Sequence, residues 1–186
     1  RGLEQGFLQA KNDDKLQFAL MWANHDWVDI HPAKLHAKPP LLYPGAVTAA
    51  TFAAMTDYII DTYFRHASYW RPGGCPYFSI YELHQLIKGL GGLEATRTAL
   101  QSFREKTRAA GFPDLHLNLV AWQLRILPGE TALTNPAEVV KYLGFDSATS
   151  YVWVHHVGLS DFPTTDYRAV MARAVDHWQR AVSGLP

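Results

Sequence analysis

Short apolar runs and longer amphipathic segments alternate along the chain. Four apolar runs are rich in β-branched and aromatic residues and show no clean two-residue alternation, which is typical of strands buried on both faces. The predicted strands are residues 16–23, 76–81, 115–122 and 149–155. Segments with apolar residues at helical spacing lie around them. The predicted helices are residues 3–12, 48–66, 93–110, 136–143 and 163–182.

The resulting order, α-β-α-β-α-β-α-β-α, predicts the α/β class with a parallel sheet and right-handed crossovers. Four β/α units fit either half of an eight-stranded barrel or a small doubly wound sheet. Residues 29–44 form an unusually long predicted loop after the first strand, and long loops in compact domains are often functional. At 186 residues, the whole chain is expected to form a single domain.

Composition narrows the possible partners. The chain is 48% hydrophobic and 18% charged, which is typical of a globular protein. Its 17 basic and 17 acidic residues balance, so the charge does not favour a nucleic acid or an anionic membrane as partner. The single cysteine, Cys75, excludes an internal disulfide and a cysteine-based zinc site. No segment approaches the roughly 20 apolar residues that span a bilayer.

The amino terminus begins at Arg1 with neither an initiator methionine nor the apolar core of a secretory signal. We therefore expect the sequence to be a piece of a longer protein. The compartment, cytoplasmic or secreted, stays open at this stage.

Polar and aromatic residues gather where each predicted strand ends. In parallel α/β architectures, ligands bind at the carboxyl ends of the strands. The candidate substrate-binding residues are Asn24, His25 and Trp27 after the first strand, Tyr81 at the end of the second, Trp122 at the end of the third, and His155 and His156 at the fourth. Glu82 is the candidate acid or base. We expect these side chains to share one rim.

Each candidate also has a structural interpretation. Asn24 could cap a turn, because asparagine bonds readily to neighbouring backbone. His25 and His156 could be structural histidines whose ring nitrogens are hydrogen-bonded within the protein. Glu82 could begin a helix, where a carboxylate favours the positive end of the dipole.

Neutral polar donors, aromatic platforms and a few carboxylates favour carbohydrate recognition. Glycoside hydrolysis needs two carboxylates across the scissile bond, and the acids near these strand ends are Asp26, Asp29 and Glu82. A metal site built from the histidines and Asp26 is an alternative, but no His-x-x-x-His or comparable spacing supports it. The glycine cluster at residues 89–92 does not directly follow a strand, so a phosphate loop is not predicted. We expect neither a metal nor a cofactor.

Several motifs resemble one family. The segment 18–27 is similar to the Trp-Ala-Asn-x-x-Trp signature of the WbsX-like family, a group of (β/α)8 domains related to glycoside hydrolase family 99. Residues 76–81 resemble the Pro-x-Phe-x-Ile-Tyr strand that follows it. Residues 149–156 and 161–167 resemble a later strand and loop of the same family. The resemblance covers nearly the whole chain.

The resemblance implies a glycan-active protein, with an oligosaccharide or polysaccharide as substrate and glycosidic bond hydrolysis as the reaction of the full-length protein. It implies the central part of a (β/α)8 barrel. The family continues into a Trp-Asn-Glu-Trp-x-Glu-Gly-like strand that carries the expected catalytic carboxylates, and this chain ends before it, at Pro186. Two alternatives remain open: a glycosyltransferase of polysaccharide (O-antigen or lipopolysaccharide) biosynthesis, and a non-catalytic glycan-binding module.

Overall fold

The centre of the protein is a parallel sheet of four strands. The computed structural model describes residues 2–29, 39–120, 136–149, 151, 157–159, 161 and 164–181. The strands are β1 (Leu20–Trp22), β4 (Tyr77–Ile80), β5 (His116–Val120) and β6 (Ser147–Thr149). They lie in the order β1-β4-β5-β6, and every neighbouring pair is parallel. The prediction of a parallel α/β sheet is therefore confirmed.

The strand boundaries differ from the predicted ones mainly at the two edges of the sheet. The first strand is shorter than residues 16–23, because Phe18 forms only an isolated bridge with Tyr69 before β1 begins. The last strand begins at Ser147, two residues before the predicted start, and it pairs with β5 over Ser147–Thr149. Residues 152–156 of that prediction lie outside the described part of the chain.

The helices of the described chain follow the predicted order with four differences, and the last helix begins at Tyr167, after its predicted start at residue 163. They are α1 (Gly2–Gln5), α2 (Ala49–Ile59), α3 (Leu83–Leu90), α4 (Leu93–Ala109), α5 (Pro136–Leu143) and α6 (Tyr167–Ala181). The predicted helix over 3–12 is wrong beyond Gln5, because Gly6 leaves the helical region and only 3₁₀ turns follow, at Phe7–Gln9 and Asp13–Lys15. Helix α2 passes into a π-helix at Ile60–Phe64, and a further 3₁₀ turn lies at Pro72–Gly74. Helix α3 was not predicted.

The missed helix explains the glycine cluster. Gly91 ends α3 in the left-handed conformation, with φ of 93°, and Gly92 precedes α4 with φ of 119°. These two conformations are accessible mainly to glycine, so the pair forms a tight corner between two helices. Gly89 lies within α3, where a Cβ would meet the Val47 carbonyl oxygen at 2.5 Å. The cluster therefore serves packing and chain reversal.

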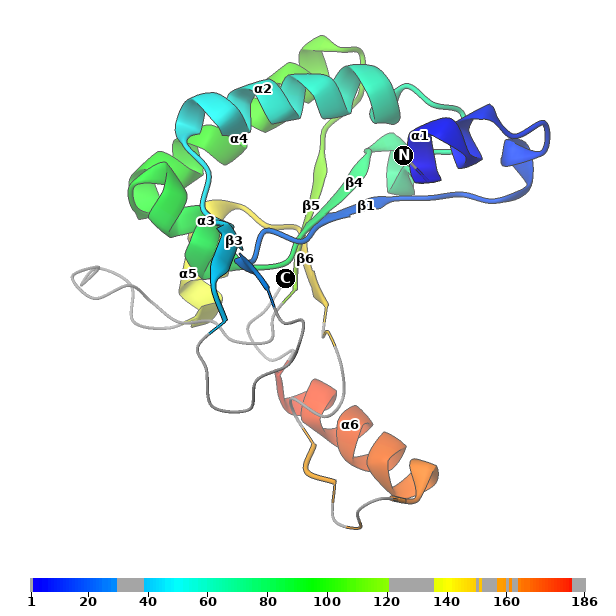
Figure 1. Cartoon of the computed structure of the whole chain (residues 1–186), viewed down its shortest axis with the longest axis vertical. Coiled ribbons are helices and arrows are strands. Elements are labelled where there is room, and N and C mark those ends of the chain that lie inside the picture. The colour runs from blue at the N-terminus through cyan, green and yellow to red at the C-terminus, as the bar shows by residue number, and fades with distance from the viewer. Residues whose placement is uncertain are drawn as a thin grey trace.

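The main core lies between one face of the sheet and helices α2 to α5. Phe78 and Ile80 of β4 and Leu117 and Leu119 of β5 are buried in one cluster with apolar side chains of these helices. The Phe103 ring of α4 meets Phe78 edge to face at a centroid distance of 5.4 Å. Figure 1 shows these helices gathered beside the strands, while α6 lies apart from them. Helix α6 has its own small buried cluster, made by Val157, Val170 and Ala174.

Residues that alternate with the core positions carry a ladder of polar side chains on the other face of the sheet. The Ser79 hydroxyl donates to Asn118 Oδ1 at 2.8 Å, and Asn118 Nδ2 donates to the Ser147 hydroxyl at 2.9 Å. The Thr149 hydroxyl also donates to Asn118 Oδ1. Asn118 has no exposed surface, so this network satisfies its amide inside the sheet. The central strands β4 and β5 are thus buried on both faces, as predicted.

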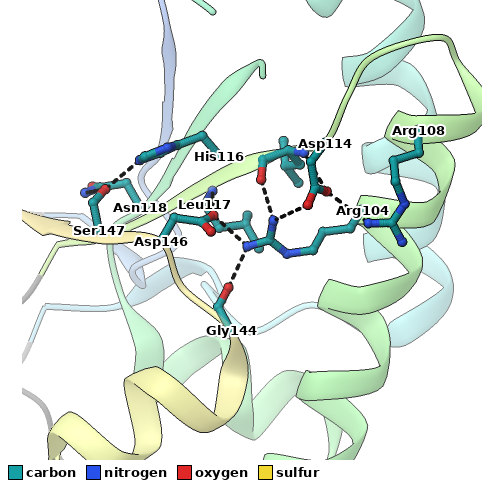
Figure 2. A network of polar contacts seen from close by, with 10 residues as sticks. Arg104, Arg108, Asp114, His116, Leu117, Asn118, Gly144, Asp146 and Ser147 are labelled. Atoms are coloured by element: carbon teal, nitrogen blue, oxygen red, sulfur yellow. Dashed lines mark hydrogen bonds and ion pairs between the residues drawn. The ribbon is translucent and has the colours of Figure 1, made fainter. Parts of the chain in front are cut away.

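A guanidinium clamp closes the amino-terminal end of β5 and β6. Arg104 of α4 donates to the carbonyls of Leu115 and Gly144 and pairs with Asp146 at 2.6 Å. Asp146 Oδ2 in turn accepts the Leu117 N–H at 2.7 Å (Figure 2). The clamp joins α4, the starts of β5 and β6 and the end of α5. It lies at the amino-terminal edge of the sheet, and the candidate site lies at the carboxyl edge.

Candidate functional site

The candidate site lies at the carboxyl ends of β1 and β4. Because the strands are parallel, their carboxyl ends share one edge of the sheet. The Trp22 carbonyl at the end of β1 accepts the N–H groups of both Asn24 and Tyr81. This shared acceptor brings the two segments after the strands side by side.

Asn24 connects these segments through its side chain. Its Nδ2 donates to the Glu82 carbonyl at 2.7 Å, and its Oδ1 accepts the Glu82 N–H at 2.8 Å. The asparagine is only 2% exposed. The amide therefore replaces a pair of sheet hydrogen bonds just beyond the point where β1 and β4 stop pairing.

A two-stranded antiparallel hairpin follows β1, and its second strand replaces residues 41–43 of the predicted loop 29–44. It is formed by β2 (Trp27–Val28) and β3 (Leu41–Tyr43), in which Trp27 pairs with Tyr43. Directly paired residues of antiparallel strands project from the same face. Both rings are solvent-exposed, at 57% for Trp27 and 71% for Tyr43. The hairpin thus presents two aromatic side chains beside the sheet edge.

Gly45 fixes this hairpin against the end of β1. A Cβ on Gly45 would lie 2.4 Å from the Asn24 carbonyl oxygen and 2.5 Å from the His25 carbonyl carbon. The Gly45 N–H also donates to Asp26 Oδ1 at 2.8 Å. Only a residue without a side chain allows this approach, and the Asp26 carboxylate is used to hold it.

The sheet edge and the hairpin border an open hollow of about 230 Å³. None of its lining residues carries a carboxylate, ammonium or guanidinium group. They are Trp22, Ala23, Asn24, His25, Trp27, Tyr43, Pro44, Gly45 and Val47. Aromatic walls combined with placed polar groups are a feature that this hollow shares with small-molecule sites.

Aromatic contacts extend from the hollow along the edge. The His25 ring stacks on Trp27 at 5.7 Å and 15°, and it meets Tyr81 edge to face at 5.6 Å. Tyr81 meets Tyr151, beyond β6, at 4.9 Å. Burial and then the neighbouring Tyr151 raise the pKa of the Tyr81 phenol, so this hydroxyl keeps its proton at neutral pH.

Glu82 stands at the N-cap position of α3, but its side chain makes no capping hydrogen bond. Its main chain is held instead by Asn24, so the helix start is fixed without using the carboxylate. Glu82 follows Tyr81 directly, and its charge contributes to the raised pKa of that phenol. The carboxylate is therefore electrostatically coupled to the aromatic edge.

The structure brings together the candidates Asn24, His25, Trp27, Tyr81 and Glu82. The other three, Trp122, His155 and His156, lie outside the described residues. Among the described residues, no group of three or more His, Cys, Asp or Glu side chains could hold a metal ion. None of the described helices is both long and apolar enough to cross a membrane.

Three contributors to the site were missed from the sequence. Tyr43 belongs to the apolar run 41–43, which lies between the pair Pro39-Pro40 and the single Pro44, a signal that could have revealed a short strand. Tyr151 lies in the fourth apolar run, where its neighbours gave no reason to single it out. Gly45 has no sequence signal at all, because only the folded backbone shows what approaches it.

Comparison with known proteins gives one match. The model of the family described as glycosyltransferase WbsX matches residues 3–179. No match was found among curated proteins or among solved structures. The match confirms the resemblance first indicated by the motif at Trp22–Trp27. The chain therefore belongs to the WbsX glycosyltransferase family, a family of glycan-active proteins.

Proposed function

We propose that this protein binds a glycan in the hollow between the sheet edge and the hairpin and acts on a glycosidic bond there. The observation that carries the proposal is the gathering of Trp27, Tyr43 and His25 around a hollow with no lysine, arginine or carboxylate in its lining, with Tyr81 in contact with His25 beside it. Aromatic faces bury the apolar faces of sugar rings, and the imidazole, phenol and amide groups supply hydrogen bonds to hydroxyls. The proposal includes that this chain is the central part of a (β/α)8 barrel and that the four parallel strands belong to the wall of that barrel.

Hydrolysis is the first candidate reaction, and Glu82 is its proposed acid or base. The carboxylate stands at the carboxyl edge of the sheet, next to an aromatic wall, and capping of α3 does not occupy it. A hydrolase needs a second carboxylate. Asp26 is already bonded to the Gly45 N–H, so we propose that the partner of Glu82 comes from outside the described residues.

Transfer from an activated sugar is the second candidate reaction, and the family description favours it. A nucleotide-sugar donor carries a diphosphate, which normally requires basic side chains or a glycine-rich loop. The lining residues of the hollow include neither lysine nor arginine. A transferase would therefore bind the diphosphate beyond this hollow.

The test combines binding and turnover with one variant. Glycans are screened for binding to the purified protein, and bound glycans are then incubated alone or with nucleotide sugars, with products followed by mass spectrometry. Hydrolysis that Glu82→Gln abolishes, with glycan binding retained, supports the first reaction. Chain extension that depends on a nucleotide sugar supports the second. Binding without turnover in either assay would contradict both reactions and leave a binding module, and the absence of any glycan binding would contradict the whole proposal.

A further inference from the structure

The aromatic residues of the site form a continuous row that is longer than the hollow. The row runs from Trp27 through His25 and Tyr81 to Tyr151, with centroid steps of 5.7, 5.6 and 4.9 Å. It begins on the hairpin, crosses the ends of β1 and β4, and finishes beyond β6. Its two outer members are open to solvent, since Trp27 is 57% and Tyr151 is 47% exposed.

The two exposed ends are two separate stacking positions. At one end, Trp27 and its strand partner Tyr43 border the hollow. At the other end, Tyr151 stands edge to face with Tyr81, at 86° between the ring planes, and Tyr151 does not line the hollow. Exposed tryptophan and tyrosine offer large, rigid, amphipathic surfaces, so each end can hold one ligand ring.

His25 occupies the middle of the row and offers a polar group between the two positions. Its Nδ1 lies 3.0 Å from the Asp26 carbonyl oxygen, which favours the tautomer with the proton on Nδ1. Nε2 is then an acceptor, and no described residue donates a hydrogen bond to it. A ligand hydroxyl above the ring can donate to this nitrogen.

The charge of the row restricts the ligand. No lysine or arginine lines the hollow, and two carboxylates lie beside the aromatic residues: Asp26, which is bonded to the Gly45 N–H, and Glu82, whose charge acts on Tyr81. A sugar carboxylate or phosphate would lose its hydration here without gaining a cationic partner. A neutral sugar has no such penalty.

We propose that the row is a track for a linear, neutral oligosaccharide, with one sugar at the Trp27–Tyr43 end, another at the Tyr81–Tyr151 end, and His25 bonding the chain between them. The proposal rests on the function proposed above and specifies its substrate as an extended neutral chain. A single sugar would fill only the hollow and leave Tyr151 unused.

The test measures affinity against chain length. Glucose, mannose and galactose, each with its oligosaccharides of two to five residues, are titrated into the protein by calorimetry, together with an oligouronate series of the same lengths. We expect the affinity for the preferred neutral series to rise about tenfold or more between one and three residues, as a second stacked ring is added. Tyr151→Ala should remove this gain and leave the monosaccharide affinity unchanged, whereas Trp27→Ala should weaken both.

Controls separate the track from the general fold. Tyr167→Ala removes a tyrosine that is 64% exposed on α6, and it should leave all affinities unchanged. Tyr151→Leu keeps apolar bulk but lacks the flat face, and it should behave like Tyr151→Ala. If monosaccharides bind as tightly as trisaccharides, or if Tyr151→Ala changes nothing, the track is wrong while the proposed glycan site stands. Stronger binding of the oligouronates would overturn the neutral ligand, and no binding of any sugar would overturn both proposals.

Discussion

Asn24 holds both main-chain polar groups of Glu82, donating to its carbonyl at 2.7 Å and accepting its N–H at 2.8 Å. One side chain thus joins the segment after β1 to the residue at the N-cap of α3. Glu82, the candidate acid, follows β4, and the aromatic hairpin follows β1. The position of one relative to the other therefore depends on the Asn24 amide.

Replacing Asn24 by alanine should destabilise the protein. The change leaves the Glu82 N–H without its acceptor, a loss that costs about 1–3 kcal/mol, whereas the Glu82 carbonyl keeps the Leu86 N–H as donor. Urea unfolding followed by circular dichroism measures the change. Stability equal to that of the unmodified chain would show that Asn24 does not hold the edge together.

The variant Asn24→Asp is a matched control with a pH signature. A carboxylate still accepts the Glu82 N–H but faces the Glu82 carbonyl oxygen without a proton to donate. Protonation restores a donor, so the folded state raises the pKa of the introduced carboxyl above its ordinary value near 4. The stability of this variant relative to the unmodified chain should therefore fall as the pH rises from the ordinary pKa of the carboxyl through its raised pKa in the folded state. A constant difference between pH 3 and pH 7 would contradict this account.

Gly45→Ala should displace the hairpin and impair ligand binding. Its Cβ would collide with main-chain atoms of Asn24 and His25, which cannot move without disturbing the edge. We expect a loss of about 1–3 kcal/mol in unfolding free energy, as in other overpacked sites, and weaker glycan binding. Gly158→Ala is the control, because no atom lies within 4 Å of its added Cβ. Equal behaviour of the two variants would contradict a close approach at Gly45.

Arg104→Met should destabilise the protein far more than Arg108→Met. Arg104 bonds two main-chain carbonyls and the Asp146 carboxylate, and it is mostly buried, so its loss should cost about 2 kcal/mol or more. Arg108 makes one exposed pair with Asp114, which is worth about 0–1 kcal/mol. Thermal and urea unfolding of both variants provide the comparison, and similar losses would show that the clamp is not specific.

Removing the Tyr58 or Tyr63 hydroxyl should raise the pKa of Glu4. Both phenols donate to Glu4 Oε1, and these hydrogen bonds, first Tyr58 and then Tyr63, hold the pKa of that carboxyl below its usual value. These hydrogen bonds increase the free energy of unfolding at pH values above the ordinary carboxyl pKa. This contribution is lost as the pH falls through the lowered pKa of Glu4. NMR titration of Glu4 in Tyr58→Phe and Tyr63→Phe measures the change. An unaltered titration in both variants would contradict the contact between α1 and the α2 region.

The core of the fold could be predicted from the sequence because its signals are local. The apolar runs around Phe78 and Leu117 predicted the central strands, and Thr48 accepts the Thr51 N–H at the start of α2, where the predicted helix begins. Gly144, with φ of 77°, follows α5 where the sequence predicted its end. Helix α3 was missed although Leu83, Leu86, Ile87 and Leu90 recur at helical spacing, because its eight residues follow a strand directly and run into a glycine cluster.

The candidate site could be predicted only in part. Parallel topology alone indicated that the residues after β1 and β4 would meet, and the structure does bring His25 and Tyr81 into contact. The hairpin that carries Tyr43 was read as a loop, because each of its strands is only two or three residues long and their pairing is non-local. The roles of the candidate residues stay predictions.

The sequence by itself determined the alternation of strands and helices and the family, because these depend on residue types at fixed spacing along the chain, and it determined the neutral charge, which depends on composition alone. Tertiary structure alone decided that Asn24 is bonded to Glu82, that Gly45 lies against the end of β1, and that Tyr151 completes the aromatic row. These contacts join residues 20 to 70 positions apart, and the one at Gly45 leaves no space for a Cβ. Local propensity carries no information about such contacts.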